Sequence, residues 1–318
     1  MIPVDGAFII DKPARMTSHD VVASVRKIIG QRRVGHTGTL DPFATGVLVV
    51  LVGRATRLAQ FLSGAEKEYE AVIRLGYATD TGDLTGAPLQ ASFTAETQRT
   101  QRLRREEIES ALSSLRGEIE QTPPMYSAKK IAGNKLYELA RRGEEVERKA
   151  ARVNVHEFET INHDEELLNR NDDGTCDLAV RVVCSAGTYV RALAEDFGRR
   201  LGTGAHLAEL RRTRAGAFKI EKAITLDRLN ELRTNDSIEE ILISPNAALA
   251  HLPAVELNAA DVKRTLEGIV MRPNDAEPSR WTNAQPVRMH DSTGELIAVG
   301  VYDESRSFIH PKVVIWKE

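Results

Sequence analysis

Cysteine is scarce in this sequence, which contains two among 318 residues, Cys176 and Cys184. Both fall in residues 176–184, where alternating apolar side chains predict a β-strand. The two thiols would point to the same face of that strand, but they would lie too far apart along it to form a disulfide. We therefore expect a reduced protein of the kind found in the cytoplasm.

Long apolar runs are also missing. No run approaches the length that crosses a membrane, and the N-terminal residues lack a charged region followed by an apolar signal segment. We expect no membrane association. The hydrophobic content of 42% and charged content of 28% are ordinary for a soluble globular protein. A length of 318 residues suffices for one large domain and a small one.

Motifs for common cofactors are absent as well. The sequence contains no phosphate-binding P-loop, no Gly-x-Gly-x-x-Gly after a predicted strand, and no cluster of Cys and His with metal-ligand spacing. We therefore expect neither a cofactor nor a metal site.

A strong positive charge is missing too, since the formal net charge is −3 and polyanion binders are usually basic. The charges are nevertheless unevenly distributed. Residues 1–65 carry eight Lys and Arg against four Asp and Glu, and residues 191–216 carry six Arg against three acids. Because phosphates respond to the local field, a nucleic-acid partner remains open.

The sequence does contain a loop rich in glycine and threonine, residues 35–46, which presents Asp41 and leads into an apolar run at 47–52. That valine-rich run predicts a strand buried on both faces. Glycine costs backbone entropy and buries no side chain, so the loop's three glycines do not serve packing. A carboxylate fixed at the mouth of a core strand suits a reactive group, although an isolated Asp-Pro pair is more often a plain turn.

The whole motif, Gly35-His36-Thr37-Gly38-Thr39-Leu40-Asp41-Pro42, closely resembles the catalytic loop of bacterial tRNA pseudouridine-55 synthases of the TruB family. The likeness covers most of residues 6–216, in the family's order. It continues through Asp11-Lys12-Pro13, Lys67-Glu68-Tyr69-Glu70, Asp80-Thr81-Gly82-Asp83, Pro123-Pro124-Met125-Tyr126-Ser127-Ala128, Cys184-Ser185-Ala186-Gly187-Thr188-Tyr189-Val190-Arg191 and Gly204-Ala205-His206-Leu207.

The resemblance implies an α+β fold. Its catalytic domain, residues 1–243, would hold a mixed, mainly antiparallel central sheet flanked by helices, with an insertion and RNA-clasping region at about 88–150. A small C-terminal PUA-like domain, α+β or barrel-like, would occupy residues 244–318; the local pattern predicts a helix at 261–266 and a hairpin turn at 291–294. Within the insertion, residues 90–107 are polar and predict a mobile surface segment.

The resemblance also implies an enzyme that isomerises uridine to pseudouridine at position 55 in the T-arm loop of tRNA. It would need no cofactor, metal, guide RNA or obligate protein partner, and we expect a monomer. Asp41 would be the catalytic group, with Tyr69 and Arg191 in support. The residues that match substrate-binding or site-shaping positions are His36, Leu210, Lys12, Tyr189, Arg211 and Arg212.

Several of these residues also have ordinary interpretations. A lysine before a proline is usually solvated, a strand tyrosine is usually core, and a run such as 211–214 is usually a solvated face. Arg191 stands apart, because the first turn of a helix, here 190–201, repels cations. We therefore expect it to serve an anion, either Asp41, which it would keep ionised, or a phosphate.

Residues 80–86 include the Asp-Thr-Gly tripeptide of aspartic proteases, but those enzymes need two such aspartates. We interpret this segment as a polar turn close to the active-site cleft. Three hypotheses remain: a tRNA pseudouridine synthase in which Asp41 acts as nucleophile or base, a non-catalytic RNA-binding or tRNA-folding protein, and a glycoside-processing enzyme that uses Asp41 and a second acid.

Overall fold

The computed structural model describes residues 4–89, 99–100, 102–127, 129–131, 134–140, 142–144, 146–161, 167–272 and 281–315. Most of the polar segment expected at 90–107 therefore lies outside the described residues, and the predicted clasping region at 88–150 is described in part. No helix within the described ranges is both long and apolar enough to span a bilayer.

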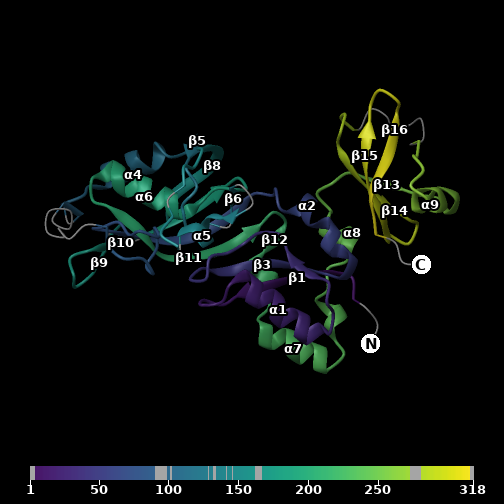
Figure 1. Ribbon diagram of the computed structural model, residues 1–318, viewed down its shortest axis with the longest axis horizontal. Helices are drawn as coiled ribbons and strands as arrows, with labels where there is room; N and C mark the ends of the chain where they lie inside the picture. Colours follow the sequence, from purple (N-terminus) through teal and green to yellow (C-terminus); the bar gives the residue numbers. More distant parts are fainter. Residues whose placement is uncertain are drawn as a thin grey trace.

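A ten-stranded sheet forms the body of the molecule (Figure 1). Strands β3 and β11 run parallel, and the other pairs described in this sheet are antiparallel, which confirms the predicted mixed, mainly antiparallel sheet. The strand order is β1 (Gly6–Lys12), β3 (Thr45–Val52), β11 (Ala205–Ala215), β4 (Lys67–Leu75), β10 (Cys176–Cys184), β8 (Ala151–Thr160) and β5 (Gly117–Gln121). Three short strands pair alongside: β2 (Val34–His36) with β3, β9 (Asn169–Arg170) with β10, and β12 (Phe218–Lys219) with β11.

Helices cover the two halves of this sheet from different sides. Figure 1 shows α4 (Arg105–Ser113) and α6 (Val190–Leu201) above one half, and α1 (Ser18–Ile29) and α7 (Leu226–Thr234) below the other. The shorter helical segments are η1 (Gly53–Leu58), α2 (Ala59–Leu62), α5 (Leu136–Ala140), η2 (Ile220–Lys222), η3 (Ile238–Glu240) and α8 (Pro245–Ala248). A separate two-stranded ribbon pairs β6 (Lys130–Ile131) with β7 (Asn134–Lys135).

Helix α1 shows why the sequence folds locally as it does. The Thr17 hydroxyl accepts from the Asp20 amide, the Asp20 carboxylate accepts from the Thr17 amide, and Gly30 ends the helix at φ 72°. The apolar face then packs on β1 and β3 through residues that include Val21, Val25 and Ile29. These caps are set by residues next to the helix in the sequence, and α1 becomes a fixed wall beside the loop that precedes β3.

The C-terminal part is a small four-stranded sheet with helix α9 (Ala259–Leu266) beside it, and its hairpin turns at residues 291–294 as predicted. Its strands are β13 (Ala254–Glu256), β14 (Pro286–His290), β15 (Leu296–Asp303) and β16 (Phe308–Val314). Val299 and Val313 share one apolar cluster with Val47 and Val49 of the main sheet. The small sheet therefore packs directly on the body, and the division at residue 243 stays a prediction.

Gly46 allows β3 to approach β11 closely. It adopts φ 99°, and a Cβ placed there would lie 2.2 Å from the carbonyl oxygen of Arg212. A side chain at this position would therefore strain the backbone and separate the two strands. This pairing matters for the site, because it joins the strand after Asp41 to the strand that carries Leu210 and Arg212.

Replacing Gly46 by alanine tests that contact. Left-handed strain and overpacking together should lower the free energy of unfolding by about 3 kcal/mol, measured by urea denaturation. Gly294→Ala is the matched control, since Gly294 has φ 83° and a Cβ at that position would meet no neighbour within 4 Å. It should lose only the backbone contribution, about 1 kcal/mol. Equal losses in the two variants would contradict the close-approach explanation.

Candidate active site

A cavity of about 340 Å³ opens where the loop before β3 meets β4, β11 and the start of α6. This volume falls within the range of small-molecule sites. Its walls come from the loop 37–41, from Ser63, Lys67, Tyr69 and Ser127, from the turn 185–191, and from Leu210 and Arg212. Six of the nine site residues predicted from the sequence line this cavity, namely Asp41, Tyr69, Tyr189, Arg191, Leu210 and Arg212.

Asp41 lies in the loop between β2 and β3, and its side chain remains one-third exposed within the cavity. The residue before it is clamped to α1, because the Leu40 amide donates to the Ser18 hydroxyl over 2.9 Å and that hydroxyl donates to the Leu40 carbonyl. The Asp41 carbonyl in turn accepts from the Ala44 amide at 3.1 Å. The backbone on both sides of the carboxylate is thus fixed.

Arg191, at the start of α6, holds the Asp41 side chain. Its Nε lies 2.9 Å from Asp41 Oδ2 and its Nη2 donates to Oδ1 over 3.2 Å, a two-point contact made by a guanidinium that is 3% exposed. The remaining donors bind the carbonyls of Thr81 and Tyr126 at 2.8 and 2.7 Å. The predicted anionic partner of Arg191 is therefore Asp41.

A second carboxylate, Asp83, lies behind the same arginine and was not singled out from the sequence. Its Oδ2 is 3.7 Å from Arg191 Nη1, and its side chain is 6% exposed. The Thr81 hydroxyl and the Thr85 amide each donate to Oδ1 over 2.9 Å. Residues 80–86 do form a turn near the cleft, as expected. The sequence pattern did not reveal that Asp83 within this turn contacts Arg191.

The two carboxylates set the acidity of the site. Burial raises the pKa of Asp41 above its usual range, the Arg191 guanidinium opposes the rise, and the Asp83 carboxylate adds to it. Arg191 thus favours the ionised form of Asp41, as expected, but its contribution is smaller than that of burial, so the net shift is upward.

Tyr69 and Leu210 form an apolar wall of the cavity. Tyr69 is 8% exposed on β4, and Leu210 is 7% exposed on the neighbouring strand β11. Both belong to the same apolar cluster as Leu40. Burial raises the pKa of the Tyr69 phenol, so the ring meets the cavity in its neutral form.

Lys12 is fully buried, so the solvated interpretation of this lysine is wrong. Its ammonium donates to the carbonyls of Pro13, Met16 and Pro42 at 2.8, 2.7 and 3.3 Å. Burial lowers its pKa to about 8, while the Asp41 charge opposes that change. In this arrangement Lys12 fixes the peptide that follows Asp41; contact with substrate remains a prediction.

Tyr189 lines the cavity just before α6 and is held by Gln121, a residue that sequence reasoning missed. The Tyr189 amide donates to Gln121 Oε1 over 2.7 Å, and Gln121 Nε2 donates to the Tyr189 carbonyl over 3.1 Å. The two bonds satisfy both backbone groups of Tyr189. No sequence signal marked Gln121, because its partner is far along the chain.

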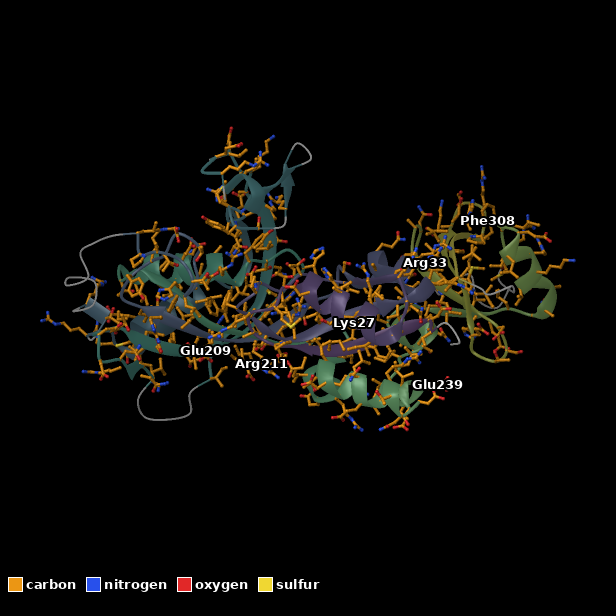
Figure 2. The ribbon with its side chains drawn as sticks, turned by 60° about the horizontal axis from the view of Figure 1, so that its bottom comes forward. Lys27, Arg33, Glu209, Arg211, Glu239 and Phe308 are labelled. Atoms are coloured by element: carbon orange, nitrogen blue, oxygen red, sulfur yellow. The ribbon has the colours of Figure 1, made fainter. Side chains whose placement is uncertain are left out.

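The arginines at 211–214 do not form one solvated face, because β11 directs adjacent residues to opposite faces. Arg212 is 2% exposed, lines the cavity and donates to the carbonyls of Val47 and Gly38 at 2.7 and 3.1 Å. Arg211 faces the other side, beside Glu209 (Figure 2), and pairs with Asp11 at 2.8 Å. Substrate contact by Arg211 or Arg212 stays a prediction.

His36 lies outside the cavity lining, on β2. Its ring meets that of His19 edge to face, with centroids 5.6 Å apart, and its Nδ1 has no hydrogen-bond partner among the described residues. Burial, together with the charge of His19, lowers its pKa to about 4, so the ring is neutral at physiological pH.

Comparison with known proteins places this geometry in a family. The model of the TruB family pseudouridylate synthase N-terminal domain matches residues 26–190, and that of the tRNA pseudouridylate synthase B C-terminal domain matches residues 191–251. The chain belongs to the TruB family. The tRNA pseudouridine synthase B of Thermobifida fusca is 41% identical over 314 residues, covering 98% of both chains. That of Geobacillus thermodenitrificans is 43% identical over 269 residues, covering 85% of this chain and 86% of the relative.

Solved structures with the same fold extend the likeness. A chain from an H/ACA ribonucleoprotein bound to a substrate RNA containing 2′-deoxyuridine aligns with a TM-score of 0.71 and 25% identity, over 98% of this chain and 85% of that one. In this TruB-family chain, no group of three or more His, Cys, Asp or Glu within the described ranges is arranged to hold a metal ion.

Removing the second carboxylate tests the electrostatics of this TruB-family site. In Asp83→Asn, the Asp41 carboxyl should titrate at a lower pH than in the wild type, because a neighbouring negative charge is gone and Arg191 serves one acid. Carbon-13 NMR of aspartate-labelled protein measures this, with Asp41→Asn assigning the signal. Asp177→Asn is the control, since Asp177 pairs with Arg74 at 2.8 Å elsewhere. An Asp41 titration midpoint that is unchanged or higher in Asp83→Asn would refute the conclusion that the Asp83 charge raises the pKa of Asp41.

Proposed function

We propose that this TruB-family protein isomerises uridine to pseudouridine at position 55 in the T-arm loop of tRNA. The observation that carries the proposal is an ionisable carboxylate, Asp41, fixed by a buried arginine inside a cavity of nucleotide size. The names of the relatives, each a tRNA pseudouridine synthase B, support the substrate. The reaction breaks the bond from ribose C1′ to uracil N1 and joins C1′ to C5, so no atoms are gained or lost.

The target base has to leave the RNA stack to reach Asp41. Extrusion of a base costs a few kcal/mol, which stacking and phosphate contacts offset. Asp41 then acts either as a nucleophile at C1′ or as a base and charge stabiliser while the sugar becomes cationic. Uracil departs as an anion delocalised over its ring, turns within the cavity and bonds to C1′ through C5. C5 then loses its proton to a base and N1 gains a proton, so the product has the same composition as uridine.

The walls of the cavity suit that rotation. The neutral Tyr69 ring offers a stacking surface for the detached base, and Leu210 and Leu40 limit the access of water that would hydrolyse the sugar. The anchored loop keeps Asp41 within reach of the same carbon before and after the base turns.

A glycoside-processing reaction is less well supported. Such enzymes generally place two carboxyl groups on either side of the scissile bond. Asp83 is the nearby second acid, but it is buried behind Arg191, occupied by Thr81 and Thr85, and absent from the cavity lining. It is poorly placed to protonate a leaving group.

We further propose that the protein acts on tRNA without a guide RNA and as a monomer. The match to a tRNA pseudouridine synthase B over 98% of both chains supports recognition of tRNA by the chain itself. The remaining alternative is an RNA-binding or tRNA-folding protein that performs no chemistry. It would bind RNA at the same cavity but form no pseudouridine.

Asp41→Asn separates these hypotheses. It should abolish conversion of a T-arm stem-loop while keeping affinity within a few-fold, because the amide retains the shape of the carboxylate but not its charge. Pseudouridine is measured by tritium release from C5 and binding by fluorescence anisotropy. Conversion that persists in the variant would place the active site elsewhere. Binding without conversion in both proteins would favour the RNA-binding module, and release of free uracil would favour glycoside hydrolysis.

Tyr69→Phe distinguishes the phenol from its ring. If the neutral hydroxyl relays the C5 proton, accepting it while passing its own proton on, single-turnover conversion should slow by about 100-fold with RNA affinity retained. Tyr69→Leu, which also removes the ring, should be slower still. A rate in Tyr69→Phe equal to that of the wild type would limit Tyr69 to stacking.

A further inference from the structure

Arg15 occupies a backbone conformation that suits glycine. It lies in the turn between β1 and α1 with φ 68°, in the left-handed region. Four residues other than glycine share that region among the described residues: Arg15, Asp236, Ala284 and Ser307. A side chain at such a position strains the backbone, so its presence needs a reason.

The surrounding contacts force this conformation on Arg15. Its amide donates to the Pro42 carbonyl over 2.7 Å. The buried Lys12 ammonium gathers the carbonyls of Pro13 and Met16, on both sides of Arg15, and also reaches Pro42. The turn is therefore fastened to the peptide immediately after Asp41. Arg15 lies one hydrogen bond away from the catalytic loop.

The Arg15 side chain is exposed, and within the described parts of the chain no hydrogen bond or ion pair engages its guanidinium. The cations of the cavity differ in this respect. Arg191 binds Asp41, Arg212 binds backbone carbonyls, and the Lys67 ammonium donates to the carbonyls of Ser63 and Ala65. Because these cations already bind groups of the protein, an RNA phosphate at the rim of the cavity needs a different cation as its partner.

We propose that Arg15 binds a phosphate of the RNA strand beside the extruded nucleotide, an inference that rests on the proposed function. When a nucleotide enters the cavity, its own phosphates stay outside it. The Arg15 turn is joined through the Pro42 carbonyl to the residue that follows Asp41, and Asp41 lines the cavity. The planar guanidinium matches two phosphate oxygens. The strained backbone at Arg15 then fixes the direction from which the side chain reaches the strand.

Stability and affinity should change in opposite directions in Arg15→Gly. Relief of backbone strain should raise the melting temperature by about 2 °C, while loss of the guanidinium weakens T-arm binding by about tenfold. Arg15→Ala should lose the same affinity without the gain in stability, and Arg15→Lys should recover part of the affinity. Ala284→Gly is the matched control, since Ala284 has φ 65° and a neutral side chain. It should gain stability with affinity unchanged.

Salt and phosphate dependence identify the ligand. The slope of log affinity against log salt should fall by about 0.7 in Arg15→Gly, as for one contact to a single strand. A neutral methylphosphonate at one linkage flanking the target uridine should weaken binding to the wild type but not further weaken binding to Arg15→Gly. An unchanged slope, or additive losses at every flanking linkage, would overturn the inference. These measurements follow binding and do not depend on pseudouridine formation. Whether the wild type converts uridine to pseudouridine therefore tests the proposed function independently of the role of Arg15.

Discussion

The buried guanidinium of Arg191 is the interaction on which the site depends. It joins four segments that are distant in sequence: the loop at Asp41, the turn at Thr81 and Asp83, the carbonyl of Tyr126, and helix α6 itself. A buried charge that loses a partner destabilises a protein strongly, so these segments are stable only in this mutual arrangement. Arg191 stands in the first turn of α6, where the helix dipole disfavours a cation. From that position it holds together the segments that surround the cavity.

The same contact resolves two demands that would conflict on Asp41 in its proposed catalytic role. Orientation requires a tight partner, but a single arginine would also make Asp41 a weak base. Asp83 shares the guanidinium, and together with burial it moves the pKa of Asp41 upward rather than downward. Asp41 thus stays oriented while it keeps the basicity that the proposed attack on a sugar, or removal of a proton, would require.

The features readable from the sequence were those set by neighbours along the chain. Thr17 and Gly30 bound α1, the valine run at 47–52 forms β3, and Asp41 stands out because glycines and a proline surround it. Asp83 and Gln121 were missed because their significance lies in distant partners: Arg191 lies 108 residues after Asp83, and Tyr189 lies 68 residues after Gln121. The different faces of Arg211 and Arg212 follow from strand alternation, but only once 205–215 is known to be a strand.

The loop at Asp41 is held on both sides by groups that are already in place. Ser18 and Lys12 bind it from the side of α1, and Arg212 binds Gly38 and Val47 from the side of β11. The carbonyls of this loop are thus hydrogen-bonded in the absence of a ligand. A movement of the loop toward a substrate would break buried hydrogen bonds to charged side chains. The proposed reaction therefore places the conformational change in the RNA. The protein offers a fixed cavity, and the free energy needed to extrude the base comes from contacts that the strand makes at its rim.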